Sequence, residues 1–139
     1  MHEWALAEAV VLTAVEVAQR EHLSEVSLLT LRMGELQQIE REAFDFALAE
    51  LIKPRKALLG NARVEIEKEE ARFTCRVCSH SWGFKDVQSA LPGSDAEAVH
   101  FVPEMAHAFM RCPNCGSPDF EITQGRGIRV ASVTGERRP

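Results

Sequence analysis

The chain has 139 residues, about the size of one ordinary domain, and apolar residues make up 45% of it. Acidic residues outnumber basic ones 21 to 16, so the formal net charge is −5. This balance argues against nonspecific nucleic-acid binding, because proteins with that activity usually carry a basic excess on one face. No stretch approaches the roughly 20 apolar residues of a membrane-spanning helix. Glu3 and Glu8 stand where a secretory signal would be basic. These features predict a cytoplasmic protein.

The first half of the chain predicts two helices around a strand. Residues 3–22 carry polar residues at helical spacing in a segment otherwise rich in Ala, Val and Leu. Residues 24–35 alternate in the manner of a strand that ends near Gly34. Residues 37–53 return to the helical period, and Pro54 is expected to stop that helix.

The second half predicts two more strands on either side of a cysteine-containing segment. Residues 61–73 alternate apolar and acidic side chains, which is typical of a strand with one solvated face. The cysteines fall within residues 75–115, which include a turn-rich stretch at 91–98, and residues 125–133 alternate again.

Two helices and three strands are enough to bury a core, whereas one hairpin would be only marginally stable. We therefore predict an α+β fold in which a three-stranded sheet carries two helices. Residues 1–70 and 124–139 are expected to form this α/β domain. Residues 71–123 are expected to form an inserted domain that resembles a zinc ribbon.

Two CxxC pairs form the strongest motif in the sequence: Cys75 and Cys78 in "CRVC", and Cys112 and Cys115 in "CPNCG". Cysteines of a cytosolic protein stay reduced, so two close pairs indicate metal ligands before disulfides. Each CxxC turn lets two thiolates converge on one cation, and four thiolates make the closed tetrahedral site that structural zinc prefers.

Other readings of the cysteines remain open at this point. A thioredoxin-like redox motif needs one CxxC that opens a helix, and here there are two. An iron–sulfur site would show ferredoxin spacing, and a catalytic zinc site would need an open position. His80, in "CRVCSH", could compete for the fourth ligand position or be a surface histidine.

The chain begins "MHEW", which places the α-amine of Met1, the imidazole of His2 and the carboxylate of Glu3 within three residues. The amine, the His2 amide nitrogen and the imidazole can close two fused chelate rings around Cu(II) or Ni(II), which favour square-planar nitrogen ligands. A frayed terminus without function is the alternative. His100 and His107 lie between the CxxC pairs and could be ligands or packing residues.

The full pattern resembles the HypA/HybF family of nickel metallochaperones for [NiFe]-hydrogenase maturation, and its archaeal branch in particular. Six segments carry the resemblance, in the same order along the chain: "MHEWALAEAV", "RMGELQQIE", "FTCRVC", "HFVPE", "CPNCGS" and "GRGIRV". The resemblance implies an α/β nickel-binding domain that carries an inserted zinc domain. It implies that Met1, His2 and Glu3 bind Ni(II), with His100 as a further ligand when the domains pack suitably.

The resemblance further implies that Cys75, Cys78, Cys112 and Cys115 hold a structural Zn(II). Nickel would be delivered by ligand exchange, without catalysis, together with a HypB-type GTPase and towards the hydrogenase large subunit. The main alternative is a zinc-ribbon module that binds protein or nucleic acid without transferring nickel. The cysteine segment has no basic excess to favour nucleic acid. A metalloenzyme is a further alternative, but the sequence offers no positioned general base beside His2 and His100.

Overall fold

The computed structural model describes residues 2–36, 39–88, 93–101 and 105–137, and for His2, Gln88, His100 and Phe101 it describes the backbone alone. The chain divides into two compact units. The helix–sheet unit comprises Met1–Arg32, Ile39–Glu67 and Ile128–Pro139. The cysteine unit comprises Met33–Gln38 and Lys68–Gly127. The domain limits expected from the sequence, residues 1–70 with 124–139 and residues 71–123, stay a prediction.

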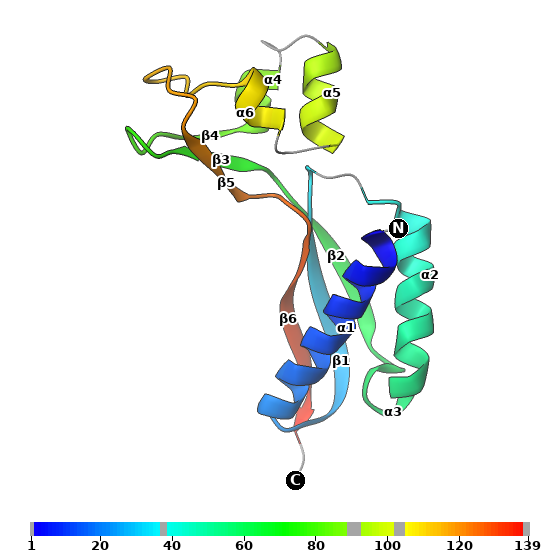
Figure 1. Ribbon diagram of the computed structural model, residues 1–139. Coiled ribbons are helices and arrows are strands. Elements are labelled where there is room, and N and C mark those ends of the chain that lie inside the picture. Colours follow the sequence, from blue (N-terminus) through cyan, green and yellow to red (C-terminus); the bar gives the residue numbers. More distant parts are fainter. Residues whose placement is uncertain (1, 37–38, 89–92, 102–104, 138–139) are drawn as a thin grey trace. The chain divides into compact units, whose positions relative to one another are not determined.

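The helix–sheet unit is built on a three-stranded sheet of order β2-β1-β6 (Figure 1). Its strands are β1 (Leu23–Gly34), β2 (Arg63–Glu69) and β6 (Ile128–Arg137), and the ends of β1 and β2 continue into the cysteine unit. Helix α1 (His2–Arg20) packs against α2 (Arg41–Ile52) and against β6. The predicted α+β class, with one three-stranded sheet and two main helices, is confirmed.

The core of this unit follows from two periodicities. Alternate residues Leu29 and Leu31 of β1 are fully buried, as expected for one face of a strand. The helices contribute residues three and four apart, which share one helix face. These buried helical residues are Ala7, Val10, Val11, Ala14, Val15 and Ala18 of α1 and Phe44, Ala47 and Leu48 of α2. No helix of the described residues has the length and apolar character needed to cross a membrane.

Helix α2 starts later than residue 37, where the sequence pattern placed it. Glu40 is its N-cap, and the Glu40 side chain accepts a hydrogen bond from Glu42 N at 3.2 Å. A cap satisfies one of the amides that the first helical turn leaves without partners. Pro54 ends the helix as predicted: a 3₁₀ turn, η1 (Lys53–Arg55), and a short helix, α3 (Lys56–Leu59), follow α2.

The single strand predicted over residues 61–73 is wrong, since the structure has two strands there. β2 ends at Glu69 in the first sheet, and β3 (Arg72–Cys75) begins in a second sheet. Alternation alone could not reveal the break. Ala71, which lies between the two strands in the chain, is buried, and its N–H donates to the Glu35 carboxylate at 2.7 Å.

The cysteine unit holds the second sheet, of order β4-β3-β5, in which β3 pairs antiparallel with both neighbours. The outer strands are β4 (Ser81–Gly83) and β5 (Phe120–Gln124). The described residues of this unit also form the helices α4 (Phe84–Gln88), α5 (Gly93–Phe101) and α6 (Ala106–Phe109). The turn-rich stretch predicted at 91–98 is thus helical from Gly93 onward, and residues 91–92 lie outside the described part of the chain.

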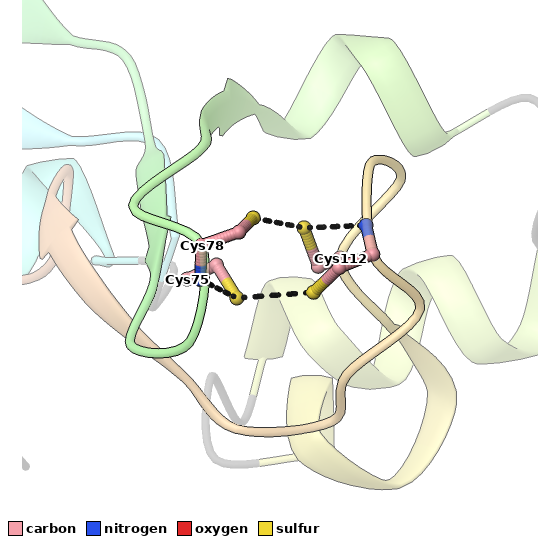
Figure 2. A group of neighbouring side chains, drawn as sticks. Cys75, Cys78 and Cys112 are labelled. Carbon is pink, nitrogen blue, oxygen red and sulfur yellow. Dashed lines mark hydrogen bonds between the residues drawn. The ribbon is translucent and has the colours of Figure 1, made fainter.

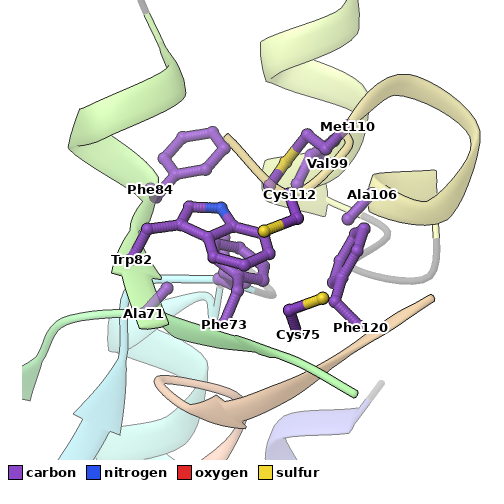
Figure 3. Close-up of a cluster of buried hydrophobic side chains, with 11 residues drawn as sticks. Ala71, Phe73, Cys75, Trp82, Phe84, Val99, Ala106, Met110, Cys112 and Phe120 are labelled. Atoms are coloured by element: carbon purple, nitrogen blue, oxygen red, sulfur yellow. The ribbon is translucent and has the colours of Figure 1, made fainter. Parts of the chain in front are cut away.

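Aromatic side chains form the centre of the cysteine unit (Figure 3). Phe73 stacks on Trp82 with ring centroids 5.8 Å apart, and Phe120 meets the Phe73 ring edge-on at 5.8 Å. Trp82 and Phe120 approach each other to 5.4 Å. Cys75 and Cys112 belong to the same buried cluster, so the aromatic core directly supports two of the four cysteines.

A close crossing of chain segments fixes the edge of the cysteine unit. Gly34 N–H donates to Gly127 O at 2.7 Å, and Leu36 N–H donates to Gly125 O at 3.0 Å. A Cβ on Gly34 would lie 2.2 Å from Gly125 O, and Gly125 itself has φ +90°, so both positions require glycine. Leu36 is fully buried in the aromatic cluster.

Candidate metal centre

Two turns bring the four predicted cysteines together. Cys75 is the last residue of β3, Cys78 follows in the next turn, and Cys112 and Cys115 lie in the turn between α6 and β5. The four sulfur atoms all lie within 4.8 Å of one another. Figure 2 shows the labelled cysteines, Cys75 and Cys78 on one loop and Cys112 on the other, facing each other. The Sγ–Sγ distance is 3.6 Å for Cys75–Cys115 and also for Cys78–Cys112.

This sulfur geometry fits zinc. Four sulfurs placed about 2.3 Å from one Zn²⁺ in a tetrahedron are about 3.8 Å apart, close to the observed 3.6 Å. A disulfide would need about 2.05 Å, and all four cysteines are free. Among the described residues, this is the only group of three or more His, Cys, Asp or Glu side chains whose atoms lie close enough to share a metal ion.

The two turns have the same backbone design. Cys75 N–H donates to His80 O at 2.8 Å, and Cys112 N–H donates to Ser117 O at 2.9 Å. The residue after each second cysteine is left-handed, with φ +64° at Ser79 and +77° at Gly116. Glycine adopts this conformation without strain, and in the first turn a serine adopts it.

Backbone amides point at the first sulfur of each turn. Cys75 Sγ accepts from Val77 N at 3.3 Å and Cys78 N at 3.4 Å. Cys112 Sγ accepts from Asn114 N at 3.4 Å and Cys115 N at 3.5 Å. Such donors stabilise a thiolate, the form in which cysteine binds metal. The backbone of both turns therefore aims amide donors at the first ligand sulfur.

Asn114 adds a donor that sequence reasoning missed. Its side-chain Nδ2 reaches across to Cys78 Sγ at 3.5 Å. This amide, together with the backbone N–H of His80, lowers the pKa of Cys78 to about 6. At Cys115 the Ser117 amide acts in the same sense, but burial and the three neighbouring cysteines outweigh it and raise the pKa to about 12. A bound cation would favour the thiolate at both positions.

The two described histidines near this centre stack on aromatic rings. His80 lies parallel to Trp82, with ring centroids 5.9 Å apart and an interplanar angle of 15°. His107 lies 4.5 Å from Phe120 at 23°. The cluster of potential ligands contains four cysteines and neither histidine. These contacts give both histidines a packing role.

The predicted nickel residues are described only in part. Met1 lies outside the described residues, His2 is the first residue of α1, and His100 lies in α5, the last two without described side chains. Glu3 Oε1 accepts a hydrogen bond from Glu40 N at 3.1 Å. The N-terminal ammonium, first, and the Glu40 amide, second, lower the pKa of the exposed Glu3 carboxyl to about 2.

The fold and the sulfur cluster define a metal-binding α+β protein with a tetrathiolate centre. The family model described as "Hydrogenase/urease nickel incorporation, metallochaperone, hypA" matches residues 1–135. The chain is 44% identical to the hydrogenase maturation factor HypA of Pyrococcus abyssi, over 99% of this chain and 97% of the relative. It is 43% identical to that of Thermococcus onnurineus, over 99% and 97%. The chain therefore belongs to the HypA family.

Solved structures agree with the fold. The solution structure of the Ni metallochaperone HypA from Helicobacter pylori superposes with a TM-score of 0.69, although only 18% of residues are identical. The match covers 98% of each chain. At this identity the likeness establishes the shared fold.

Proposed function

We propose that this protein binds Ni(II) at its N-terminus and delivers it for the maturation of [NiFe]-hydrogenase, while the four cysteines hold a structural zinc ion. The observation that carries the proposal is the family match over residues 1–135, which includes both the "MHE" segment and both CxxC turns. In this role the protein transfers its cargo by ligand exchange and catalyses no reaction.

The start of α1 supports a nickel site at Met1, His2 and Glu3. The first four N–H groups of a helix have no partner within it. The amides of His2 and Glu3 belong to this set, so a metal can replace the His2 amide proton without breaking a helical hydrogen bond. Amine, amide nitrogen and imidazole then provide three planar nitrogen ligands, which suit Ni(II). The Glu3 carboxylate, which accepts from Glu40 N at 3.1 Å, could add an oxygen ligand.

To deliver nickel, the site must also release it, so one of the metal ligands must dissociate easily. We propose that His100 completes the site in a high-affinity state and that its departure weakens nickel binding. The bound amine and imidazole must both be deprotonated, so nickel affinity falls as pH drops through the pKa range of these groups. A delivery site of this kind holds its cargo firmly only while all ligands are engaged.

The four thiolates support a structural zinc ion, because they fill a tetrahedral coordination shell and leave no position for a substrate. Bound zinc would join the two turns and so link α6 and β5 to β3. We propose a HypB-type GTPase and the hydrogenase large subunit as partners, and the cytoplasm as the place of action, where unoxidised thiolates remain available.

Nickel titration with zinc in place tests the proposal. Isothermal titration calorimetry on the zinc-loaded chain should give one high-affinity nickel site in the wild type. His2→Ala should lower the affinity at least about a hundredfold, because it removes a chelating ring nitrogen. His22→Ala is the matched control: this exposed histidine follows α1 at its opposite end, and its loss should leave nickel binding unchanged.

His100→Ala separates the two parts of the nickel proposal. A drop in affinity of about tenfold, on the scale typical of lost metal-site interactions, is expected if His100 is a ligand. Unchanged affinity would remove His100 from the site and leave the terminal ligands standing. Equal affinities for the wild type and His2→Ala would overturn the terminal site and favour the zinc-ribbon interaction module.

A further inference from the structure

The two CxxC turns share an approximate internal symmetry of their backbone and sulfur contacts, and one of the sequence differences between them places a polar side chain next to a sulfur. Cys75 corresponds to Cys112, and Cys78 corresponds to Cys115. The backbone hydrogen bonds to the first sulfur and the left-handed residue after the second cysteine occur in both turns. The sequence difference that concerns us is at the residue that precedes the second cysteine, which is Val77 in one turn and Asn114 in the other.

The side chain of Asn114 contacts a sulfur atom of the opposite turn. Asn114 Nδ2 donates to Cys78 Sγ at 3.5 Å. The counterpart of that bond would run from residue 77 to Cys115, but Val77 has no polar side-chain atom. Cys78 therefore receives a side-chain amide donor, whereas Val77 offers none to Cys115.

Cys78 and Cys115 are also the two cysteines that a reagent in solution can reach. Cys75 and Cys112 are 1% and 2% exposed, whereas Cys78 and Cys115 are exposed. A small electrophile in solution therefore meets Cys78 and Cys115 first. In the zinc-loaded protein the ligand sulfurs are already thiolates, so a hydrogen bond to one of them only withdraws electron density from sulfur and lowers its nucleophilicity.

We propose that Asn114 is a positioning residue that protects Cys78, and that Cys115 is consequently the ligand at which the metal centre reacts with electrophiles and begins to open. The inference rests on the proposed zinc site. In the reaction with iodoacetamide, the Cys115 sulfur attacks the CH₂ carbon, a C–S bond forms, the C–I bond breaks and iodide leaves. The resulting neutral thioether binds zinc poorly, so alkylation of Cys115 releases the ion.

The test is site-resolved alkylation of the zinc-loaded full chain. Iodoacetamide labelling is stopped at intervals and mapped by peptide mass spectrometry, while a chromogenic chelator follows zinc release. In the wild type, Cys115 should be labelled first, and zinc release should keep pace with its modification. Loss of a hydrogen bond to a metal ligand typically changes metal-site properties tenfold or more. We therefore expect Cys78 to lag by on the order of tenfold.

Exchange of the two unequal residues provides matched variants. Asn114→Val should accelerate labelling of Cys78 by on the order of tenfold and leave Cys115 unchanged. Val77→Asn supplies the missing donor and should slow Cys115. The double exchange should reverse the order, so that Cys78 reacts first. Both positions are exposed, and Val77 is 67% exposed, so the changes cost little packing.

Equal rates at Cys78 and Cys115 in the wild type would overturn the proposal, as would an unchanged Cys78 rate in Asn114→Val. The order in which Cys78 and Cys115 are labelled in the wild type is itself a test of the proposal. The proposal therefore stays testable even if a variant loses its zinc ion. Asn114→Leu, which has a similar side-chain size, is uncharged and removes the donor, would replace such a variant. If added zinc slowed labelling of none of the four cysteines, the metal centre of the proposed function would fail as well. The labelling rates of Cys78 and Cys115 are compared on protein shown to hold one zinc ion. This comparison therefore tests the role of Asn114 separately from the presence of the zinc site.

Discussion

Replacement of Phe73 by alanine probes how the cysteine unit is held together. Phe73 is fully buried, and its ring contacts both Trp82 and Phe120. Core Phe→Ala changes cost about 3–5 kcal/mol, because they remove apolar contacts and leave a cavity. For a chain of this size, 1 kcal/mol lowers the melting temperature by about 4 °C. Phe73→Ala should therefore lower it by roughly 12–20 °C.

The assay is urea unfolding followed by tryptophan fluorescence. The chain has two tryptophans. In a Trp4→Phe background the remaining one is Trp82, which is 2% exposed in the aromatic cluster. All variants need the same zinc concentration, because a ligand of the folded state adds to the apparent stability.

Phe46→Ala is the matched control for this prediction. Phe46 is 64% exposed on α2, so the same chemical change there should alter the free energy of unfolding by no more than about 0.5 kcal/mol. The far-UV circular dichroism of both variants is followed alongside. If Phe73→Ala cost less than about 1 kcal/mol, or no more than Phe46→Ala, the aromatic cluster would not be the stabilising core inferred from its burial and ring contacts.

Three further predictions follow from the two units. Chelation of zinc at neutral pH should remove amide-exchange protection throughout the cysteine unit while α1 and β1 stay protected; retained protection around the cysteines would argue against a structural metal. Gly34→Ala should destabilise the chain by several kcal/mol, since its Cβ would lie 2.2 Å from Gly125 O, and an unfolding midpoint like that of the wild type would contradict the crossing described here. The depressed pKa of Glu3, about 2 against an ordinary 4.5, means that its stabilising contribution is present above about pH 5 and is lost as pH falls towards 2. Glu3→Gln should flatten that part of the pH–stability curve, and an unaltered slope would exclude Glu3 as its source.

The sequence patterns predicted the helix–sheet unit well because its elements are long and periodic. Helix α1 and strand β1 begin and end close to the predicted residues, and Pro54 stops α2. The start of α2 was misplaced because a glutamate cap, Glu40, is an unusual choice that the preferred residues Ser, Thr, Asp and Asn do not suggest. Hydrophobic periodicity predicts where a regular helix or strand runs, whereas capping and turn residues decide where it begins and ends.

The cysteine unit was less predictable for a physical reason. Its strands have three to five residues, too few to show alternation. Its core joins Phe73 to Phe120, residues far apart in the chain, and no local pattern announces such a contact. The CxxC spacing predicted which cysteines converge. It could not indicate Asn114, whose role depends on a hydrogen bond to the opposite turn.

The nickel proposal depends on a free α-amine at Met1, so extension of the chain tests it most directly. One variant carries two glycines before Met1 and keeps His2, Glu3 and both CxxC turns. Zinc-loaded wild type and the extended variant are titrated with Ni(II), and the visible absorption of square-planar nickel is recorded. The account predicts that extension abolishes this absorption and weakens binding by several orders of magnitude, while zinc content is unchanged. Equal nickel affinity and an identical spectrum in the extended protein would contradict it.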